Sequence, residues 1–211
     1  MQALTTLSLL LMLSVPAFCQ TAASEHPLTT AGSHEVQVWV GGGHGTNGRF
    51  QNTSVANLGL RYGWILTDPH GPGFLRGSFE YAVDAVPAFL LFQPDGPITI
   101  TPNGAFPIRG GFAYGAGVNP VNFKWNFVSK GRWTPYLELS GGTLFSNVNV
   151  PPGTSKINFT SGGAIGFSRQ GDTHSTSFDI RYMHISNAGL TVPNPGINTI
   201  QLRVGFGRTS R

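Results

Sequence analysis

Hydrophobic and polar residues alternate along most of the chain after residue 33, and no window shows the spacing of an amphipathic helix. Successive side chains of a β-strand point to opposite faces, so this alternation predicts strands. We expect eight of them, at residues 34–42, 54–66, 74–84, 108–128, 133–146, 157–168, 174–186 and 198–207. Asn119-Pro120 lies within the fourth segment, which is therefore either one strand or two, because proline cannot donate a hydrogen bond to a sheet.

The connections between these strands alternate in length. Long ones span residues 43–53, 85–107, 147–156 and 187–197, and short ones span 67–73, 129–132 and 169–173. Short turns at one end and long loops at the other are typical of an outer-membrane barrel. The stretch from Pro87 to Pro107 contains Phe89-Leu90-Leu91-Phe92 and is interpreted as a hydrophobic lid or as a loop that caps the barrel.

Charged residues are sorted to one face of the predicted strands. One parity is apolar and aromatic, with Val36, Val38, Val40, Leu58, Leu60, Tyr62, Trp64, Phe79, Tyr81, Val83, Phe123, Trp125, Phe127, Leu137, Leu139, Phe178, Ile180, Tyr182, Ile200, Leu202, Val204 and Phe206. The opposite parity carries four acids and four bases: Glu35, Arg61, Glu80, Lys124, Glu138, Asp179, Arg181 and Arg203. A small membrane barrel pairs such charges in its lumen and turns its aromatic residues toward lipid. A secreted β-sandwich, which would show the charges to water, is the alternative.

The composition favours the barrel. Only 10% of the 211 residues are charged, against about 25% in an ordinary soluble domain. The net charge of +4 comes without a cluster of Lys or Arg, so no nucleic-acid partner is expected. No run of about 18 apolar residues follows the N-terminal segment, which excludes a transmembrane helix there.

The N-terminal segment is typical of a secretory signal peptide. Leu9–Val15 is almost entirely apolar and Ala17-Phe18-Cys19 resembles a cleavage signal, although no Lys or Arg precedes the apolar run. A lipoprotein would use Cys19 as its lipid anchor, but the bulky Phe18 before it argues against that. We predict a signal peptide at 1–19, a flexible leader at 20–33 and an outer-membrane barrel domain at 34–211.

Three polar residues of the seventh and eighth predicted strands lie on the lipid-facing parity. His184 and Ser186 are two residues apart on one strand, so their side chains leave the same face. Asn198 opens the next strand on the parity of Ile200, so a hairpin brings the three together outside the barrel, at the long-loop end. A serine nucleophile, a histidine base and a third orienting group suit acyl transfer from an ester. The alternative is a set of hydrogen-bonded surface groups at the membrane interface.

Other motifs carry less chemistry. Gly41-Gly42-Gly43-His44-Gly45 lacks the lysine and the following helix of a phosphate-binding loop, so a surface loop is predicted. His44, His70 and His174 do not have the spacing of metal ligands. We therefore expect no metal and no cofactor.

Two strings of residues follow one another in this region: His184-Ile185-Ser186-Asn187-Ala188-Gly189 and Pro193-Asn194-Pro195-Gly196. They resemble the signature of the outer-membrane lipid A 3-O-deacylases, also called acyloxyacyl hydrolases. Pro135-Tyr136-Leu137-Glu138-Leu139 and Phe159-Thr160-Ser161 also resemble stretches of that family. The resemblance implies an eight-stranded barrel in the outer membrane of a Gram-negative-type bacterium. It also implies an active site at the outer-leaflet rim that hydrolyses the ester-linked 3-hydroxyacyl chain at position 3 of lipid A.

The same resemblance implies a role for each residue of the site. Ser186 is the nucleophile and His184 the general base, while the backbone amide of Gly189 and the side chain of Asn194 form the oxyanion hole. Asn187 holds the loop or the hole in shape.

Asn198 departs from the family pattern, because well-studied members carry a Glu there that orients the histidine. An amide oxygen can accept a hydrogen bond from imidazole but cannot balance the charge of an imidazolium, so slower catalysis is expected. The expected partner is lipid A or lipopolysaccharide in the outer leaflet, and the oligomeric state is left open. The alternatives are a non-catalytic outer-membrane barrel with a structural or adhesive role and a soluble secreted β-sandwich that binds a ligand.

Overall fold

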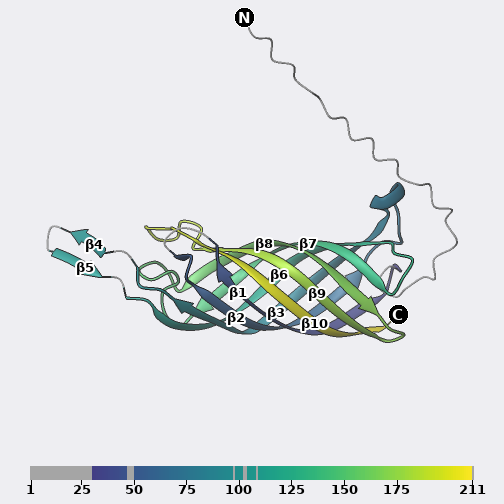
Figure 1. Ribbon diagram of the computed structural model, residues 1–211, viewed down its shortest axis with the longest axis horizontal. Coiled ribbons are helices and arrows are strands. Elements are labelled where there is room, and N and C mark those ends of the chain that lie inside the picture. The colour runs from purple at the N-terminus through teal and green to yellow at the C-terminus, as the bar shows by residue number, and fades with distance from the viewer. Residues whose placement is uncertain (1–29, 47–49, 97, 102–103, 108, 211) are drawn as a thin grey trace, which may run out of the picture.

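The computed structural model describes residues 30–210 apart from 47–49, 97, 102–103 and 108. Eight strands form a closed antiparallel barrel: β1 (His34–Gly45), β2 (Ser54–Ile65), β3 (Gly77–Gln93), β6 (Gly111–Phe127), β7 (Trp133–Ser146), β8 (Ile157–Gln170), β9 (His174–Ser186) and β10 (Ile197–Ser210). Their order is β1-β10-β9-β8-β7-β6-β3-β2, and the pairing of β1 with β10 closes the barrel (Figure 1). Closure leaves no open sheet edge. The predicted all-β barrel is confirmed, and the β-sandwich alternative is wrong.

Two small elements lie outside the barrel wall. β4 (Ile98–Thr101) and β5 (Gly104–Pro107) pair as a separate hairpin that projects beyond the long-loop end (Figure 1). The 3-10 turn η3 (Gly73–Leu75) lies in the connection from β2 to β3, toward the short-turn end. No helix in the described ranges is long and apolar enough to cross a membrane. The predicted signal peptide and most of the predicted leader lie outside the described residues.

Two expectations about the strands need correction, and one open question is answered. The surface loop predicted at Gly41–Gly45 is the end of β1. The long connection expected at 85–107, with its lid or capping loop, begins as strand, because β3 continues to Gln93 and includes Phe89-Leu90-Leu91-Phe92. The connection from β3 to β6 therefore begins only after Gln93. The fourth segment, left open as one strand or two, is one: β6 runs through Asn119-Pro120, and the pairing register with β7 shifts between Val118 and Val121.

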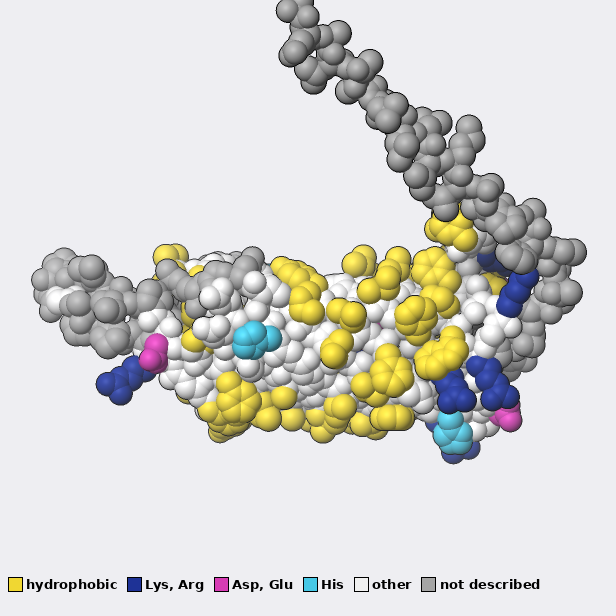
Figure 2. Space-filling model, viewed as in Figure 1, with side chains coloured by type: hydrophobic (Ala, Val, Ile, Leu, Met, Phe, Trp, Pro, Cys, Tyr) yellow, Lys and Arg dark blue, Asp and Glu magenta, His cyan; other side chains and the backbone are white. Residues whose placement is uncertain are grey.

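The outer wall of the barrel is apolar, as the parity of the sequence predicts. Leu139, Leu202 and Phe206 are 62–66% exposed, values that a water-soluble core position would not show. Figure 2 shows hydrophobic side chains spread along the wall, with charged side chains gathered toward the two ends. This is the surface that a barrel presents to hydrocarbon.

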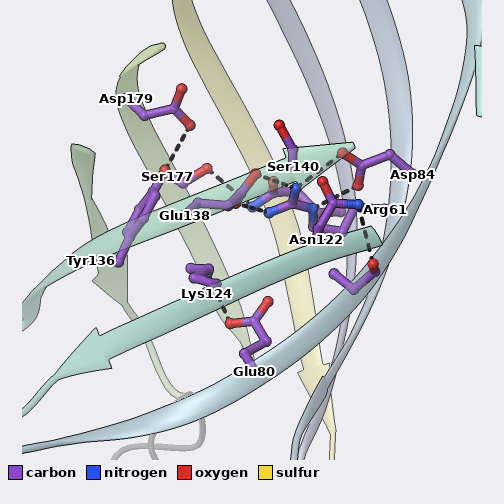
Figure 3. Close-up of polar contacts among 12 residues, drawn as sticks. Arg61, Glu80, Asp84, Asn122, Lys124, Tyr136, Glu138, Ser140, Ser177 and Asp179 are labelled. Atoms are coloured by element: carbon purple, nitrogen blue, oxygen red, sulfur yellow. Dashed lines mark hydrogen bonds and ion pairs between the residues drawn. The ribbon is translucent and has the colours of Figure 1, made fainter. Parts of the chain in front are cut away.

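The lumen contains a network of paired charges, and all eight charged residues predicted for it are buried. Asp84, which the parity analysis missed, joins them as a fifth acid and is 1% exposed. The Arg61 Nε lies 2.7 Å from Asp84 Oδ1, and its Nη1 lies 2.6 Å from Glu138 Oε2. Arg181 also bonds Glu138, at 2.7 Å between Nη2 and Oε1. Figure 3 shows Arg61, Asp84 and Glu138 of this network. Mutual pairing offsets the cost of removing these charges from water.

Toward the long loops the lumen becomes apolar. Its buried hydrophobic residues form one cluster: Trp39, Phe50, Val55, Val86, Phe89, Leu91, Ala113, Leu144, Val150, Met183, Ile185 and Ile197. Phe50 and Val150 belong to the long connections, so these loops pack against the lumen at the long-loop end of the barrel. The cluster anchors the strand ends that carry the predicted site.

Candidate active site

The hairpin of β9 and β10 places His184 and Asn198 side by side on the outer wall. The two residues are direct partners in the antiparallel register. Their neighbours Ile185 and Ile197 point into the lumen, where they are 0% and 1% exposed. Burying these two side chains in the apolar cluster turns His184, Ser186 and Asn198 outward, as the parity of the sequence predicts.

Asn198 holds the imidazole of His184. Its Oδ1 lies 2.6 Å from the Nδ1 of His184, and the Tyr182 hydroxyl donates to the same oxygen at 2.8 Å. The hydroxyl of Tyr182 thus keeps the amide oxygen turned toward the histidine. When Nδ1 carries the proton, the lone pair of His184 is on Nε2, the nitrogen that acts as the base in a Ser-His arrangement.

Ser186 stands two residues further along β9, on the same face as His184. In the part of the chain that the structure describes, its hydroxyl has no hydrogen-bond partner. Its register partner on β8 is Phe159, whose side chain is 40% exposed on the outer wall. The nucleophile predicted from the sequence is therefore flanked by an apolar surface, with an imidazole next along the strand. Catalytic hydrogen bonds are often longer without substrate and tighten when it binds.

Asn187 organises the loop that follows Ser186. It is 1% exposed, and its Nδ2 donates to Thr191 Oγ1 at 2.7 Å and to the Thr191 carbonyl at 3.2 Å. Its Oδ1 accepts from the Gly189 backbone N–H at 2.8 Å, and its own backbone N–H donates to Asn194 Oδ1 at 3.1 Å. The two predicted oxyanion-hole residues are therefore both tied to Asn187.

The backbone of this loop bends sharply just after Asn187. Ala188 has a φ of 51° and Gly189 a φ of 85°, and the former is the only non-glycine residue with positive φ in the described chain. A left-handed alanine is strained by about 1–3 kcal/mol and persists only where its surroundings enforce it. The bend turns the Gly189 amide back toward Asn187 Oδ1.

Gly196 lies against His184, a contact that the sequence pattern does not predict. A Cβ at this position would lie 2.6 Å from Cε1 of His184, and the backbone φ of Gly196 is +64°. Both the close approach and the left-handed backbone require glycine. Tyr182 was also missed as a site residue, although its position two residues before His184 places it on the same face.

In the part of the chain that the structure describes, no acid takes the place of the glutamate expected at position 198. Glu138 and Asp179 are buried in the lumen, at 2% and 4% exposed, on the other side of the wall from His184. Asp172 lies in the turn between β8 and β9, at the opposite end of the barrel. Among the described residues, no group of three or more His, Cys, Asp and Glu side chains could hold a metal ion.

A family model of the lipid A 3-O-deacylases (PagL) matches residues 88–207, more than half of the chain and the part that contains the whole site. The chain belongs to this deacylase family. The resemblance that the His184–Gly196 region suggests is thus confirmed, and the family places the barrel in the outer membrane. No curated protein matches the chain in sequence.

Solved structures support the fold of this family member. The crystal structure of the outer membrane enzyme PagL has a TM-score of 0.57 and 19% identity, covering 80% of this chain and 97% of that one. The crystal structure of the outer membrane protein OprG from Pseudomonas aeruginosa has a TM-score of 0.56 and 11% identity, covering 89% and 100%. At these identities the likeness concerns the barrel alone.

Proposed function

We propose that this family member is an outer-membrane esterase that removes the ester-linked 3-hydroxyacyl chain at position 3 of lipid A. The single observation that carries the proposal is the 2.6 Å contact between His184 Nδ1 and Asn198 Oδ1 on the apolar outer wall, beside an outward-facing Ser186. A buried or lumenal site could not meet a lipid ester, whereas a site on the apolar outer wall can.

The reaction follows the course of serine esterases. His184 Nε2 takes the proton of the Ser186 hydroxyl as Oγ attacks the ester carbonyl carbon. The resulting oxyanion is stabilised by the Gly189 amide and by Nδ2 of Asn194. The intermediate collapses, the bond to the sugar 3-oxygen breaks, and the imidazolium protonates that oxygen. Water, deprotonated by His184, then attacks the acyl-serine, and the imidazolium returns the proton to Ser186 Oγ as the 3-hydroxy fatty acid leaves.

The wall around the site suits an acyl chain. Phe159 flanks Ser186, and Ile180, below Tyr182 on β9, is 54% exposed. A fatty acyl chain can lie along these side chains without leaving the hydrocarbon, while the sugar stays at the rim with the long loops. The site is therefore proposed to lie at the outer-leaflet rim.

A non-catalytic barrel is the second candidate, and the amide at position 198 favours it. Without a carboxylate, the His184 imidazolium has no counter-ion among the described residues of the outer wall beside it. On that account the barrel would have a structural or adhesive role, and the polar residues would only hydrogen-bond one another.

Purified protein in detergent micelles, incubated with lipid A, distinguishes the two candidates. We expect release of a 3-hydroxy fatty acid by the wild type and at least a 1,000-fold lower rate, about 4 kcal/mol, for Ser186→Ala. Ser161→Ala is the matched control, because Ser161 faces outward on β8 as the register partner of His184. Equal rates for the wild type and Ser186→Ala would refute the proposed mechanism.

A further inference from the structure

The polar surface of the site continues around the barrel onto β1 and β2. Thr46, just after β1, donates its backbone N–H to the Asn198 carbonyl at 2.9 Å. Two residues earlier, His44 faces outward and its Nδ1 lies 3.0 Å from the hydroxyl of Ser54, its register partner on β2. Two hydrogen-bonded polar groups, one of His184, Asn198 and Thr46 and one of His44 and Ser54, thus lie near each other on the outer wall.

The surroundings of the His44–Ser54 pair show that it lies at the boundary of the apolar wall. Toward the short turns, the outward residues of the same strands are hydrophobic: Val40 is 51% exposed and Leu58 is 38% exposed. Ile200, the register partner of His44 on β10, is also apolar and 43% exposed. A histidine and a serine above such a surface lie where hydrocarbon gives way to lipid head groups.

The pair offers a hydrogen-bond donor without a competing carboxylate. The imidazole of the exposed His44 and the hydroxyl of Ser54 share one hydrogen bond. When Ser54 donates it, the second imidazole nitrogen carries a proton to donate, and when Nδ1 donates it, the hydroxyl keeps its own proton to donate. The described acids of β1, β2, β9 and β10, namely Glu35 and Asp179, both point into the lumen. An anionic oxygen approaching from outside would meet one donor and no like charge from these strands.

The distance between His184 and the His44–Ser54 pair suits one substrate molecule that contacts both. Neighbouring strands are about 4.8 Å apart, and the register places His44 level with Tyr182, about 7 Å along β9 from His184. With two strand spacings to His44 and three to Ser54, the pair lies about 12–16 Å from His184. That distance is comparable to the width of a phosphorylated disaccharide. A lipid whose ester lies at Ser186 can therefore extend its head group across Asn198 to His44.

We propose that His44 and Ser54 form a binding subsite for a phosphate group of the substrate lipid's head group. This inference rests on the proposed function and deepens it, because it names the second part of the substrate that the outer wall recognises. The subsite holds the head group across β10 and β1 while the ester meets Ser186. It acts on binding rather than on the chemical step.

Steady-state kinetics on lipid A test the subsite through His44→Ala. We expect a 5- to 10-fold higher KM with kcat within twofold of the wild type. His34→Ala is the matched control, because His34 also lies on β1 and its Nδ1 is 3.2 Å from the Tyr62 hydroxyl, at the other end of the barrel. An unchanged KM in His44→Ala, or an equal rise in His34→Ala, would overturn the subsite.

A binding assay separates the failure of the subsite from the failure of the proposed function. Ser186→Ala protein is titrated with lipid A, with lipid A freed of its phosphates, and with phosphatidylglycerol micelles, each with and without His44→Ala. Loss of affinity on adding His44→Ala supports the subsite even if Ser186 proves dispensable, and the lipid that shows it identifies the source of the phosphate. A loss that persists with phosphate-free lipid A would refute the assignment to phosphate.

Discussion

Asn198→Asp should raise kcat, and the size of the increase can be worked out from the contacts of His184. Aspartate has nearly the shape of asparagine, so its carboxylate can keep the 2.6 Å contact with His184 Nδ1 and the 2.8 Å bond from the Tyr182 hydroxyl. The substitution therefore adds a negative charge next to the imidazole with little change in geometry. Only the charge of the orienting group differs between the two proteins.

The gain comes from stabilising the imidazolium that forms in the transition state. Two unit charges about 4 Å apart attract by about 4 kcal/mol at an effective dielectric constant of about 20. Both residues are half-buried, so screening reduces the effect to about 1–2 kcal/mol, or about 5- to 30-fold in rate. The loss of about 10⁴ that follows an Asp-to-Asn change in serine proteases stems from the wrong histidine tautomer. Tyr182 prevents that error here by fixing the amide.

The assay is the initial rate of 3-hydroxy fatty acid release from lipid A at saturating substrate. Asn198→Glu, which restores the residue expected in the family, should also raise kcat, and Asn198→Ala should lower it. Each variant must still form a folded barrel. A gel shows this when the boiled sample migrates more slowly than the unboiled one. Unchanged or reduced kcat in both acidic variants of a folded barrel would refute the role assigned to Asn198.

Three further substitutions test the supports of the site. Gly196→Ala should lower kcat at least 10-fold, because its Cβ would lie 2.6 Å from His184 Cε1. Gly73→Ala is the control and should leave kcat unchanged, because Gly73 also has a positive φ, +50°, but has open space around it. Asn187→Ala should lower kcat 10- to 100-fold by freeing the loop, with urea unfolding of the barrel shifted little; full activity would contradict its role. Glu138→Ala should destabilise the barrel by about 3–5 kcal/mol in urea titrations followed by tryptophan fluorescence, because it removes the carboxylate that three buried arginines share. Wild-type stability in that last variant would show that the lumen network contributes little.

Alternation along the sequence predicts most of the barrel because its lumen is charged where the strands are most regular. Arg61 and Glu138 face inward between hydrophobic neighbours, which gives a clear period of two. The signal fades in the second half of β3, where Phe89 and Leu91 face an apolar lumen and Phe92 faces lipid. Both faces are hydrophobic there, so the sequence shows a run rather than an alternation, and it predicts a lid or a capping loop where the strand in fact continues.

The alternation of the strands predicts one part of the site and misses the part that the loop forms. Parity alone turns His184 and Asn198 to one face, and their register makes them neighbours. The contact of Gly196 with the imidazole depends on the path of the loop, which no periodic pattern encodes. The same holds for the hydrogen bonds of Asn187, since they join residues within an irregular segment.

Mass spectra of lipid A from cells that carry the full-length protein test the central claim most directly. The account predicts that lipid A from cells with the wild type loses the mass of one 3-hydroxyacyl chain, and that lipid A from cells with folded Ser186→Ala keeps it. Intact lipid A in both strains, or the same loss in both, would contradict a Ser186-dependent deacylase on the outer wall of this barrel.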